Sequence, residues 1–460
     1  MGAVTAKRQL DMLHGPVWNR IPQFALPLAA TAILGQLFNA ADIAVVGNFT
    51  GDMSTAAVAA VSANSALIGL VVNLFVGISL GANVTIAYAI GQDDGKAVTK
   101  AVHTAIVMAL LGGVFAAILG ELIAAPLLGA LHTPDDVLPL ALLYLRIYFA
   151  GLPVILLYNF EAAIFRSAGE TRIPLMALAA SGILNVALNL FFVAALHMTV
   201  DGVAIATVLS NAVSAAILYR CLRRTEKAVR VEPGELRIDM GSMKRILRIG
   251  LPAGLQSAVF SVANIIIQGA INSLGTIVMA ASGAAFNIEI ITYDILNSFS
   301  QACTTFVGQN FGAGKIERCK KVLGLCLLEG IAALAAAIAL ILPLGKPLLS
   351  LFNNDPQVVD VGYIRLVTLM LAHIFSLCYE VLSGYLRGFG ISLPPAALTV
   401  LGVCGVRLSW ICWVFPRRPT FQTIMAAFPI SLAVTALLML AAVLCCRPSR
   451  RFSAAEGGES

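Results

Sequence analysis

Twelve apolar stretches of about 20 residues or more run through the sequence and restrict its fold more than any other feature. A helix needs about 20 mostly apolar residues to cross the hydrocarbon core of a bilayer. Only 12% of the 460 residues are charged, whereas soluble proteins average about 25%. We therefore predict an all-α integral membrane protein. The expected spans are 23–47, 54–88, 98–125, 138–164, 173–196, 202–222, 246–270, 277–306, 322–344, 358–386, 394–415 and 422–446.

The positions of the basic residues predict the orientation of these spans. If the N-terminus is cytoplasmic, all but six of the 30 Lys and Arg residues lie on the cytoplasmic side. The six are Lys346, Arg417 and Arg418 on the opposite side and Arg146, Arg365 and Arg407 within spans. Cytoplasmic loops carry an excess of Lys and Arg, so we expect both termini in the cytoplasm. The net charge of +6 then reflects topology, and we expect no nucleic-acid partner.

The two halves of the sequence repeat each other in the same order. Ile21, Pro27 and Asn39 recur 225 residues later as Ile246, Pro252 and Asn264. The other pairs are Gly91-Gln92 with Gly308-Gln309, Tyr144-Leu145-Arg146 with Tyr363-Ile364-Arg365, and Arg166-Ser167-Ala168-Gly169 with Arg387-Gly388-Phe389-Gly390. Each half has an even number of spans, so the repeats are parallel, an arrangement found in secondary transporters. We predict a six-helix lobe at 1–222, a cytoplasmic linker at 223–245, a second six-helix lobe at 246–446 and a cytoplasmic tail at 447–460.

Sequence patterns that would indicate an enzyme or a metal site are incomplete or lie in the wrong structural context. Gly77-Ile78-Ser79-Leu80-Gly81 matches the nucleophile elbow of hydrolases, but it lies within a predicted membrane helix and fits close helix packing better. The Gly308–Lys315 segment departs from a phosphate-binding loop in its spacing and lacks Ser or Thr after the lysine. No H-E-x-x-H motif occurs, and the nine Cys form no C-x-x-C pair. We expect no enzymatic activity, no cofactor and no metal site beyond an alkali cation.

Polar residues inside the spans are candidates for function, because a charge in the bilayer is costly. Asp42 lies in the first span, three residues after Asn39 and on the same helical face. Asn185 and Asn189 form an i, i+4 pair in the fifth span, and Thr207 lies in the sixth. Together these groups would surround one carboxylate with oxygens and could hold H+ or Na+. The alternative is interhelical hydrogen bonding without transport.

A second set of polar residues is assigned to a substrate cleft. It comprises Gln36, Asn39, Asn264, Gln268, Glu289, Asp294, Glu380 and Arg407. Two interpretations stay open for the second half. The acids line a cation-binding cleft, or Arg407 pairs with Glu380 and neutralises it.

The sequence resembles the multidrug and toxic compound extrusion (MATE) family of bacterial transporters. The resemblance rests on Asp42 followed by Val45-Val46-Gly47, on Gly312-Ala313-Gly314, on the segments at Arg166 and Arg387, and on the duplicated layout. The second half is most similar to the branch of the DinF and MepA exporters. Some members carry an acid in the seventh span, where this chain has Phe260-Ser261, so a second ion site there is not expected.

The resemblance implies a V-shaped bundle of two lobes in the bacterial inner membrane. It implies export of bulky, often cationic xenobiotic compounds in exchange for H+ or Na+, by alternating access. Its ion-site positions fall on Asp42, Asn185, Asn189 and Thr207. We expect a monomer surrounded by membrane lipid. A flippase for a lipid-linked saccharide is the alternative, and the sequence specifies neither the coupling ion nor the substrate.

Overall fold

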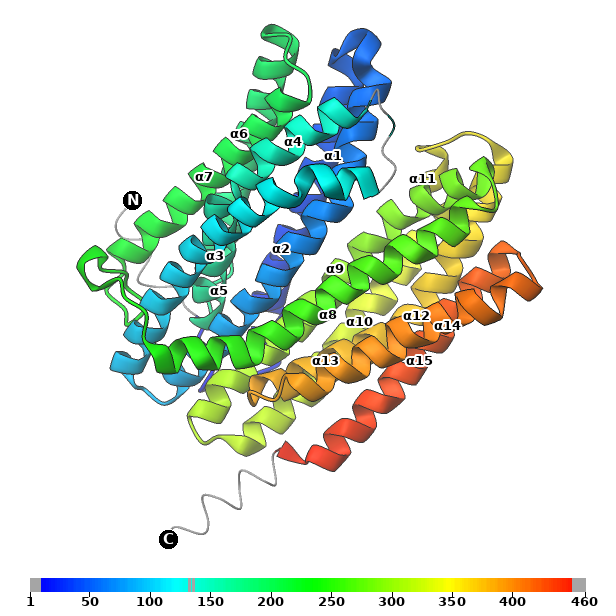
Figure 1. Ribbon diagram of the computed structural model, residues 1–460. Coiled ribbons are helices and arrows are strands. Elements are labelled where there is room, and N and C mark those ends of the chain that lie inside the picture. The colour runs from blue at the N-terminus through cyan, green and yellow to red at the C-terminus, as the bar shows by residue number, and fades with distance from the viewer. Residues whose placement is uncertain (1–9, 131–133, 135–136, 449–460) are drawn as a thin grey trace. The chain divides into compact units, whose positions relative to one another are not determined.

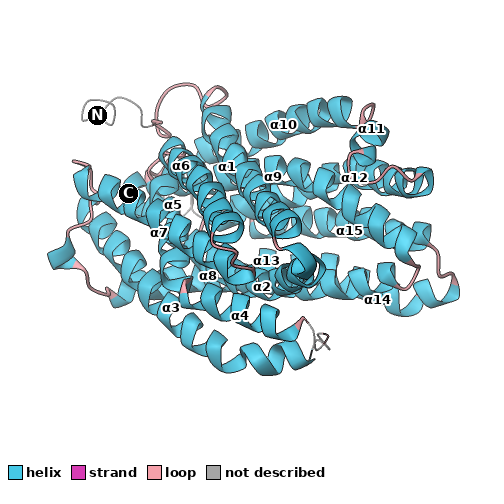
Figure 2. Ribbon diagram, turned by 90° about the horizontal axis from the view of Figure 1, so that it is seen from above, coloured by secondary structure: helices cyan, strands magenta, loops and turns pink. Residues whose placement is uncertain are grey.

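The computed structural model describes residues 10–130, 134 and 137–448, and within these ranges it consists of helices joined by short loops (Figures 1 and 2). The helices of the first half are α1 (Arg20–Phe49), α2 (Ser54–Gly91), α3 (Gly95–Ala130), α4 (Leu138–Ala150), α5 (Leu152–Ser167), α6 (Arg172–Asn189) and α7 (Val200–Arg224). Those of the second half are α8 (Met240–Asn272), α9 (Thr276–Gly312), α10 (Ile316–Ile341), α11 (Gly345–Ser350), α12 (Pro356–Gly388), α13 (Leu393–Thr399), α14 (Val406–Trp413) and α15 (Phe421–Cys446). The predicted tail lies outside the described residues beyond Pro448.

Among the described residues, eleven helical segments are long and apolar enough to cross a membrane, and a bent pair of helices adds the twelfth. The bent pair is α4 and α5, which meet at an angle of 51°. Gly151 separates them, and Pro153 follows in the first turn of α5, where it has no N–H to continue the ladder of α4. The prediction of twelve transmembrane helices is confirmed.

The fifth span of each half contains a π-helical segment. It covers Leu190–Ala195 directly after α6 in the first half. In the second half it covers Val400–Gly405, between α13 and α14. Such segments are rare and occur frequently at functional sites. The first of them begins one residue after Asn189, a member of the candidate ion site.

The chain divides into two compact units. Among the described residues, the first unit comprises Leu10 and 30–254, and the second comprises 11–29 and 255–448. Helices α1 and α8 therefore each contribute to both units. Their transitions fall two residues after Pro27 and Pro252, which are the repeat-related prolines inside these helices. Proline removes one backbone hydrogen bond of a helix, so both helices lack a bond next to the point where they change unit. The predicted lobe boundaries at 222 and 246 stay predictions.

In the first unit, α2 and the start of α8 touch through their backbones. A Cβ atom added to Gly77 would lie 2.2 Å from the nitrogen of Gly254, and one on Gly81 would lie 2.2 Å from the carbonyl oxygen of Ile246. Gly250 and Gly254 repeat the four-residue spacing of Gly77 and Gly81, so each helix presents a small-residue stripe to the other. The packing interpretation of the Gly77–Gly81 motif is confirmed.

Replacing Gly77 with Val is expected to destabilise the first unit by about 1–3 kcal/mol, the usual cost of overpacking. The added side chain meets the backbone of Gly254, which cannot rotate away as a side chain can. Thermal unfolding of the purified protein in detergent measures the effect. Gly269→Val in α8 is the matched control, because a Cβ at Gly269 has nothing within 4 Å. Equal melting temperatures for the two variants would contradict the close crossing.

In the second unit, the end of α9, the loop after it and the first turn of α10 hold the chain before α1. Asn310 Nδ2 donates to the carbonyl oxygen of Met12 (3.1 Å), and Lys315 Nζ donates to that of Leu13 (3.0 Å). The guanidinium of Arg318 donates to the carbonyls of Met12, His14 and Gly15. Met12 itself is buried. The Gly308–Lys315 segment, which resembles a phosphate loop in sequence, thus binds backbone carbonyl groups here.

Replacing Arg318 with Gln is expected to increase hydrogen exchange in residues 11–19, because three carbonyl groups lose their charged donor. Hydrogen exchange followed by mass spectrometry measures this change. Lys320→Gln removes an equal charge nearby, but Lys320 is paired only with the exposed Glu317, so exchange in this control should match that of the wild type. Unchanged exchange in the Arg318 variant would show that the other contacts suffice.

Candidate functional site

The first unit buries one acidic side chain of α1 among neutral polar groups. Asp42 is 7% exposed. Its Oδ1 accepts a hydrogen bond from Asn189 Nδ2 of α6 (2.5 Å), and its Oδ2 lies 3.2 Å from Thr207 Oγ1 of α7. Asn189 Nδ2 also donates to Asn185 Oδ1 (3.2 Å). The four residues predicted for the ion site therefore form one continuous hydrogen-bonded group.

Local helix geometry explains how these side chains meet. Asn185 and Asn189 are one turn apart on the buried face of α6. Thr207 Oγ1 also lies 2.9 Å from the carbonyl oxygen of Val203, one turn earlier in α7. A hydroxyl has only one proton to donate, so Thr207 can bond the backbone whenever the carboxyl of Asp42 no longer accepts. The site can thus accommodate a change in charge at Asp42 without leaving Thr207 unsatisfied.

The carboxylate of Asp42 has no basic partner among the described residues. None of the ion pairs found there includes it, and the buried Oδ1 of Asn189 accepts no hydrogen bond. Burying an unpaired charge costs free energy unless the charge is neutralised. Uptake of H+ by the carboxyl, or of Na+ by the surrounding oxygens, would supply that neutralisation.

The second unit contains a charged cluster of a different kind. Glu289 of α9 pairs with Arg365 of α12 through two hydrogen bonds, of 2.5 and 3.1 Å, and both side chains are less than 10% exposed. Arg365 also donates to Ser282 Oγ (2.6 Å). A carboxylate held by two guanidinium bonds is already compensated. Glu289 therefore differs from Asp42, which has only neutral partners.

The other acid and base predicted for the second half do not meet. Tyr293 donates its hydroxyl to Glu380 (3.1 Å). Arg407 instead donates to Ser431 Oγ (2.9 Å), and its guanidinium carbon lies 4.3 Å from the ring centre of Phe428. The interpretation in which Arg407 pairs with Glu380 is therefore wrong. Arg407 is buried and forms no ion pair within the described part of the chain.

The comparisons with known proteins agree with the duplicated architecture. A family model described as MatE matches the chain twice, at residues 27–191 and 252–411. The starts of the two matches are separated by the same 225 residues as Pro27 and Pro252. The chain belongs to the MATE family.

Two relatives and one solved structure illustrate the range of similarity to this MATE protein. The probable multidrug resistance protein NorM of Thermotoga maritima is 28% identical and covers 84% of this chain and 83% of its own. The multidrug export protein MepA of Staphylococcus saprophyticus is 20% identical and covers 84% of each. A structure of a multidrug resistance MATE family transporter of the MOP superfamily has a TM-score of 0.87 at 21% identity, over 98% of this chain and 99% of that one. The all-α membrane fold of the family is thereby confirmed.

The remaining residues assigned to the cleft of this MATE protein lie at the surface of their units or are half-buried. Gln36 and Asn39 are exposed on α1 in the first unit, and Asn264 is exposed on α8 in the second. Gln268 is also exposed and bonds Asn272 (2.8 Å) rather than Asn264. Asp294 is half-buried in α9. Their role in substrate binding stays a prediction.

The sequence does not indicate that Arg365 is the partner of Glu289. Arg365 is visible in the sequence as a basic residue within a span and as part of the repeated Tyr-x-Arg motif. Its counterpart Arg146 pairs with Glu121, but that pair is half-exposed. The sequence also gives no sign that His373 is buried. Its Nε2 has no hydrogen-bond partner among the described residues. No local sequence pattern indicates that these residues are buried or which side chains they contact.

Proposed function

We propose that this MATE protein is a secondary active antiporter that exports bulky, often cationic organic compounds in exchange for H+ or Na+. It acts in the bacterial plasma membrane with both termini in the cytoplasm. The observation that carries the proposal is the buried carboxylate of Asp42, held by Asn189 and Thr207 without a counter-charge among the described residues. The names of its relatives, which describe multidrug resistance and export proteins, support the substrate class.

Ion binding at Asp42 would change how α1 packs. With the carboxylate charged, Asn189 of α6 and Thr207 of α7 both donate to it and hold α1 to these helices. A proton or Na+ on the carboxyl weakens those bonds and favours a second arrangement of α1. Coupling requires that the ion and the drug prefer different arrangements. The exposed amides of Gln36 and Asn39, which lie on the same helix, would contact the drug.

The direct test is uptake of an ethidium-like dye into inverted vesicles that contain the protein. An imposed pH or Na+ gradient should drive uptake, and collapsing that gradient with an ionophore should abolish it. Applying the two gradients separately identifies the coupling ion. Absence of gradient-driven uptake for every organic cation tried would contradict the proposal.

A flippase for a lipid-linked saccharide is the second candidate. The buried guanidinium of Arg407, which has a hydroxyl and an aromatic ring as partners but no acid, favours an anionic substrate such as a diphosphate carrier. Translocation of a fluorescent phosphorylated polyprenyl lipid in proteoliposomes distinguishes this candidate. The antiporter should leave such a lipid in its original leaflet.

A further inference from the structure

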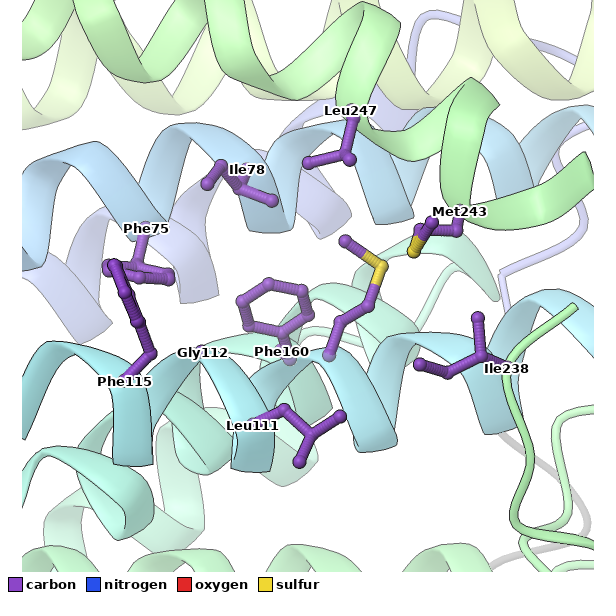
Figure 3. Close-up of a pocket in the computed structure, with 10 residues that line it drawn as sticks. Phe75, Ile78, Leu111, Gly112, Phe115, Phe160, Ile238, Met243 and Leu247 are labelled. Atoms are coloured by element: carbon purple, nitrogen blue, oxygen red, sulfur yellow. The ribbon is translucent and has the colours of Figure 1, made fainter. Parts of the chain in front are cut away.

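The first unit contains an apolar groove that none of the candidate site residues lines. It has a volume of about 310 Å³ and lies between α2, α3, α5, the segment before α8 and the first turns of α8 (Figure 3). Apart from the floor glycine Gly112, all its lining residues carry apolar side chains. They include Phe75, Met108, Leu111, Phe115, Met243 and Leu247.

The groove follows one face of α3 and opens to the surroundings. Met108, Leu111 and Phe115 recur at intervals of three or four residues and therefore share that face. Leu111 is 57% exposed and Phe115 is 65% exposed. The eight residues from Met108 to Phe115 rise by about 10 Å, about a third of a hydrocarbon core roughly 30 Å thick. The groove thus has the chemistry to hold a segment of an extended acyl chain.

Gly112 and the hydrogen bonds at the start of α8 keep this groove open. At Gly112 an added Cβ would lie 2.7 Å from Cε1 of Phe75, so any larger residue would enter the groove. Asp239 precedes α8 and accepts hydrogen bonds from the backbone nitrogen and hydroxyl of Ser242, both 2.9 Å. These bonds hold the pKa of Asp239 below its usual value, so it stays ionised. Its own backbone N–H donates to Thr104 Oγ1 (2.9 Å), which fixes the start of α8 against α3.

Three basic residues are sequence neighbours of lining residues on the side of the groove that is predicted to face the cytoplasm. Arg237 precedes the lining residue Ile238, Lys244 follows Met243, and Arg248 follows Leu247. All three are exposed and have no ion-pair partner among the described residues. Lys100, one turn before Thr104, pairs with Asp239 (3.5 Å). An apolar groove that ends in unpaired positive charge at the membrane surface is complementary to an anionic lipid.

We propose that this groove binds one acyl chain of an anionic phospholipid, whose headgroup phosphate faces Lys244 and Arg248. The acyl chain lies along Met108, Leu111 and Phe115 of α3. The same lipid would contact Leu247, two turns before α8 changes unit at Gly254. None of the four candidate ion-site residues lines the groove.

Lipid retention by the purified protein tests the proposal. Native mass spectrometry compares phosphatidylglycerol with phosphatidylcholine of identical acyl chains, and the wild type should retain phosphatidylglycerol preferentially. Lys244→Gln with Arg248→Gln should reduce that retention roughly fivefold per residue, which corresponds to about 1 kcal/mol for each basic side chain near an anionic surface. Arg417→Gln with Arg418→Gln removes the same charge from the opposite side of the membrane and should have no effect.

Fluorescence quenching by brominated lipids locates the acyl chain in the groove and does not depend on headgroup charge alone. The added indole of Leu111→Trp should be quenched more by brominated phosphatidylglycerol than by brominated phosphatidylcholine at equal mole fraction. A tryptophan at Ile183, which is 71% exposed on α6, should be quenched equally by both. Equal retention of the two lipids by the wild type, or unchanged preference after removal of Lys244 and Arg248, would overturn the proposal. Equal quenching at Leu111 would do the same.

Discussion

The variant Asp42→Asn is expected to lose ion-driven efflux while it still folds and inserts into the membrane. Asparagine has nearly the same size and keeps an oxygen that accepts from Asn189 or Thr207. It cannot take up a proton and offers no negative charge to Na+. The ion would then bind both arrangements of the transporter equally, and a ligand without differential affinity shifts no equilibrium. Gradient-driven dye uptake into inverted vesicles measures the loss.

Two controls separate a loss of coupling from a loss of structure. Asp360→Asn also removes one carboxylate, but Asp360 is exposed and pairs only with Lys346, so normal uptake is expected. Thr207→Val should retain transport with a changed apparent affinity for the ion. The affinity should rise for H+, because a donor that stabilises the charged carboxylate of Asp42 is lost, and fall for Na+, because a ligand oxygen is lost. Normal efflux by the Asp42 variant would refute the assignment of the coupling site.

The variant Arg365→Met is expected to lower the free energy of unfolding by about 3–5 kcal/mol, the usual cost of removing one partner of a buried ion pair. Glu289 would be left charged and buried, with its two guanidinium bonds gone. The melting temperature of the purified protein in detergent measures the loss. This result would identify the pair as the main electrostatic contact between α9 and α12.

The repeat provides an internal control for this second prediction. Arg146 stands in the equivalent Tyr-x-Arg motif and pairs with Glu121, but both side chains are about half exposed. Arg146→Met should therefore cost no more than about 1 kcal/mol. Adding Glu289→Gln to Arg365→Met should recover part of the lost stability, because the uncompensated charge is removed. Equal effects of the two arginine substitutions would show that burial does not determine the strength of the pair.

The sequence predicted the spans well because hydrocarbon thickness imposes a length and a composition on each of them. The structure extends most of them by a few residues at the ends, as with α2, which ends at Gly91, and α8, which begins at Met240. Where the sequence predicts one span at 138–164, the structure has two helices joined at Gly151. A bend of this kind depends on how the helices pack on their neighbours, which hydropathy does not record.

The candidate ion site was predictable because the bilayer makes each polar group conspicuous. Asp42, Asn185, Asn189 and Thr207 stand out in apolar stretches, and their contact in the structure agrees with the pocket inferred from their spacing and from the family resemblance. The second unit was less predictable. Its acids and arginines are equally conspicuous, but the sequence contains no information on which of them pair.

The sequence by itself determined the membrane class, the number of spans, the duplication and the predicted orientation, since each follows from a regular pattern that the bilayer or the repeat imposes. Only the tertiary structure decided that Glu289 pairs with Arg365 while Arg407 rests on Ser431 and Phe428. It also decided that Asp42 is held by the neutral side chains of Asn189 and Thr207, with no ion pair among the described residues. The physical reason is that pairing depends on the distance and direction between side chains on different helices, and these are fixed by packing rather than by any local pattern.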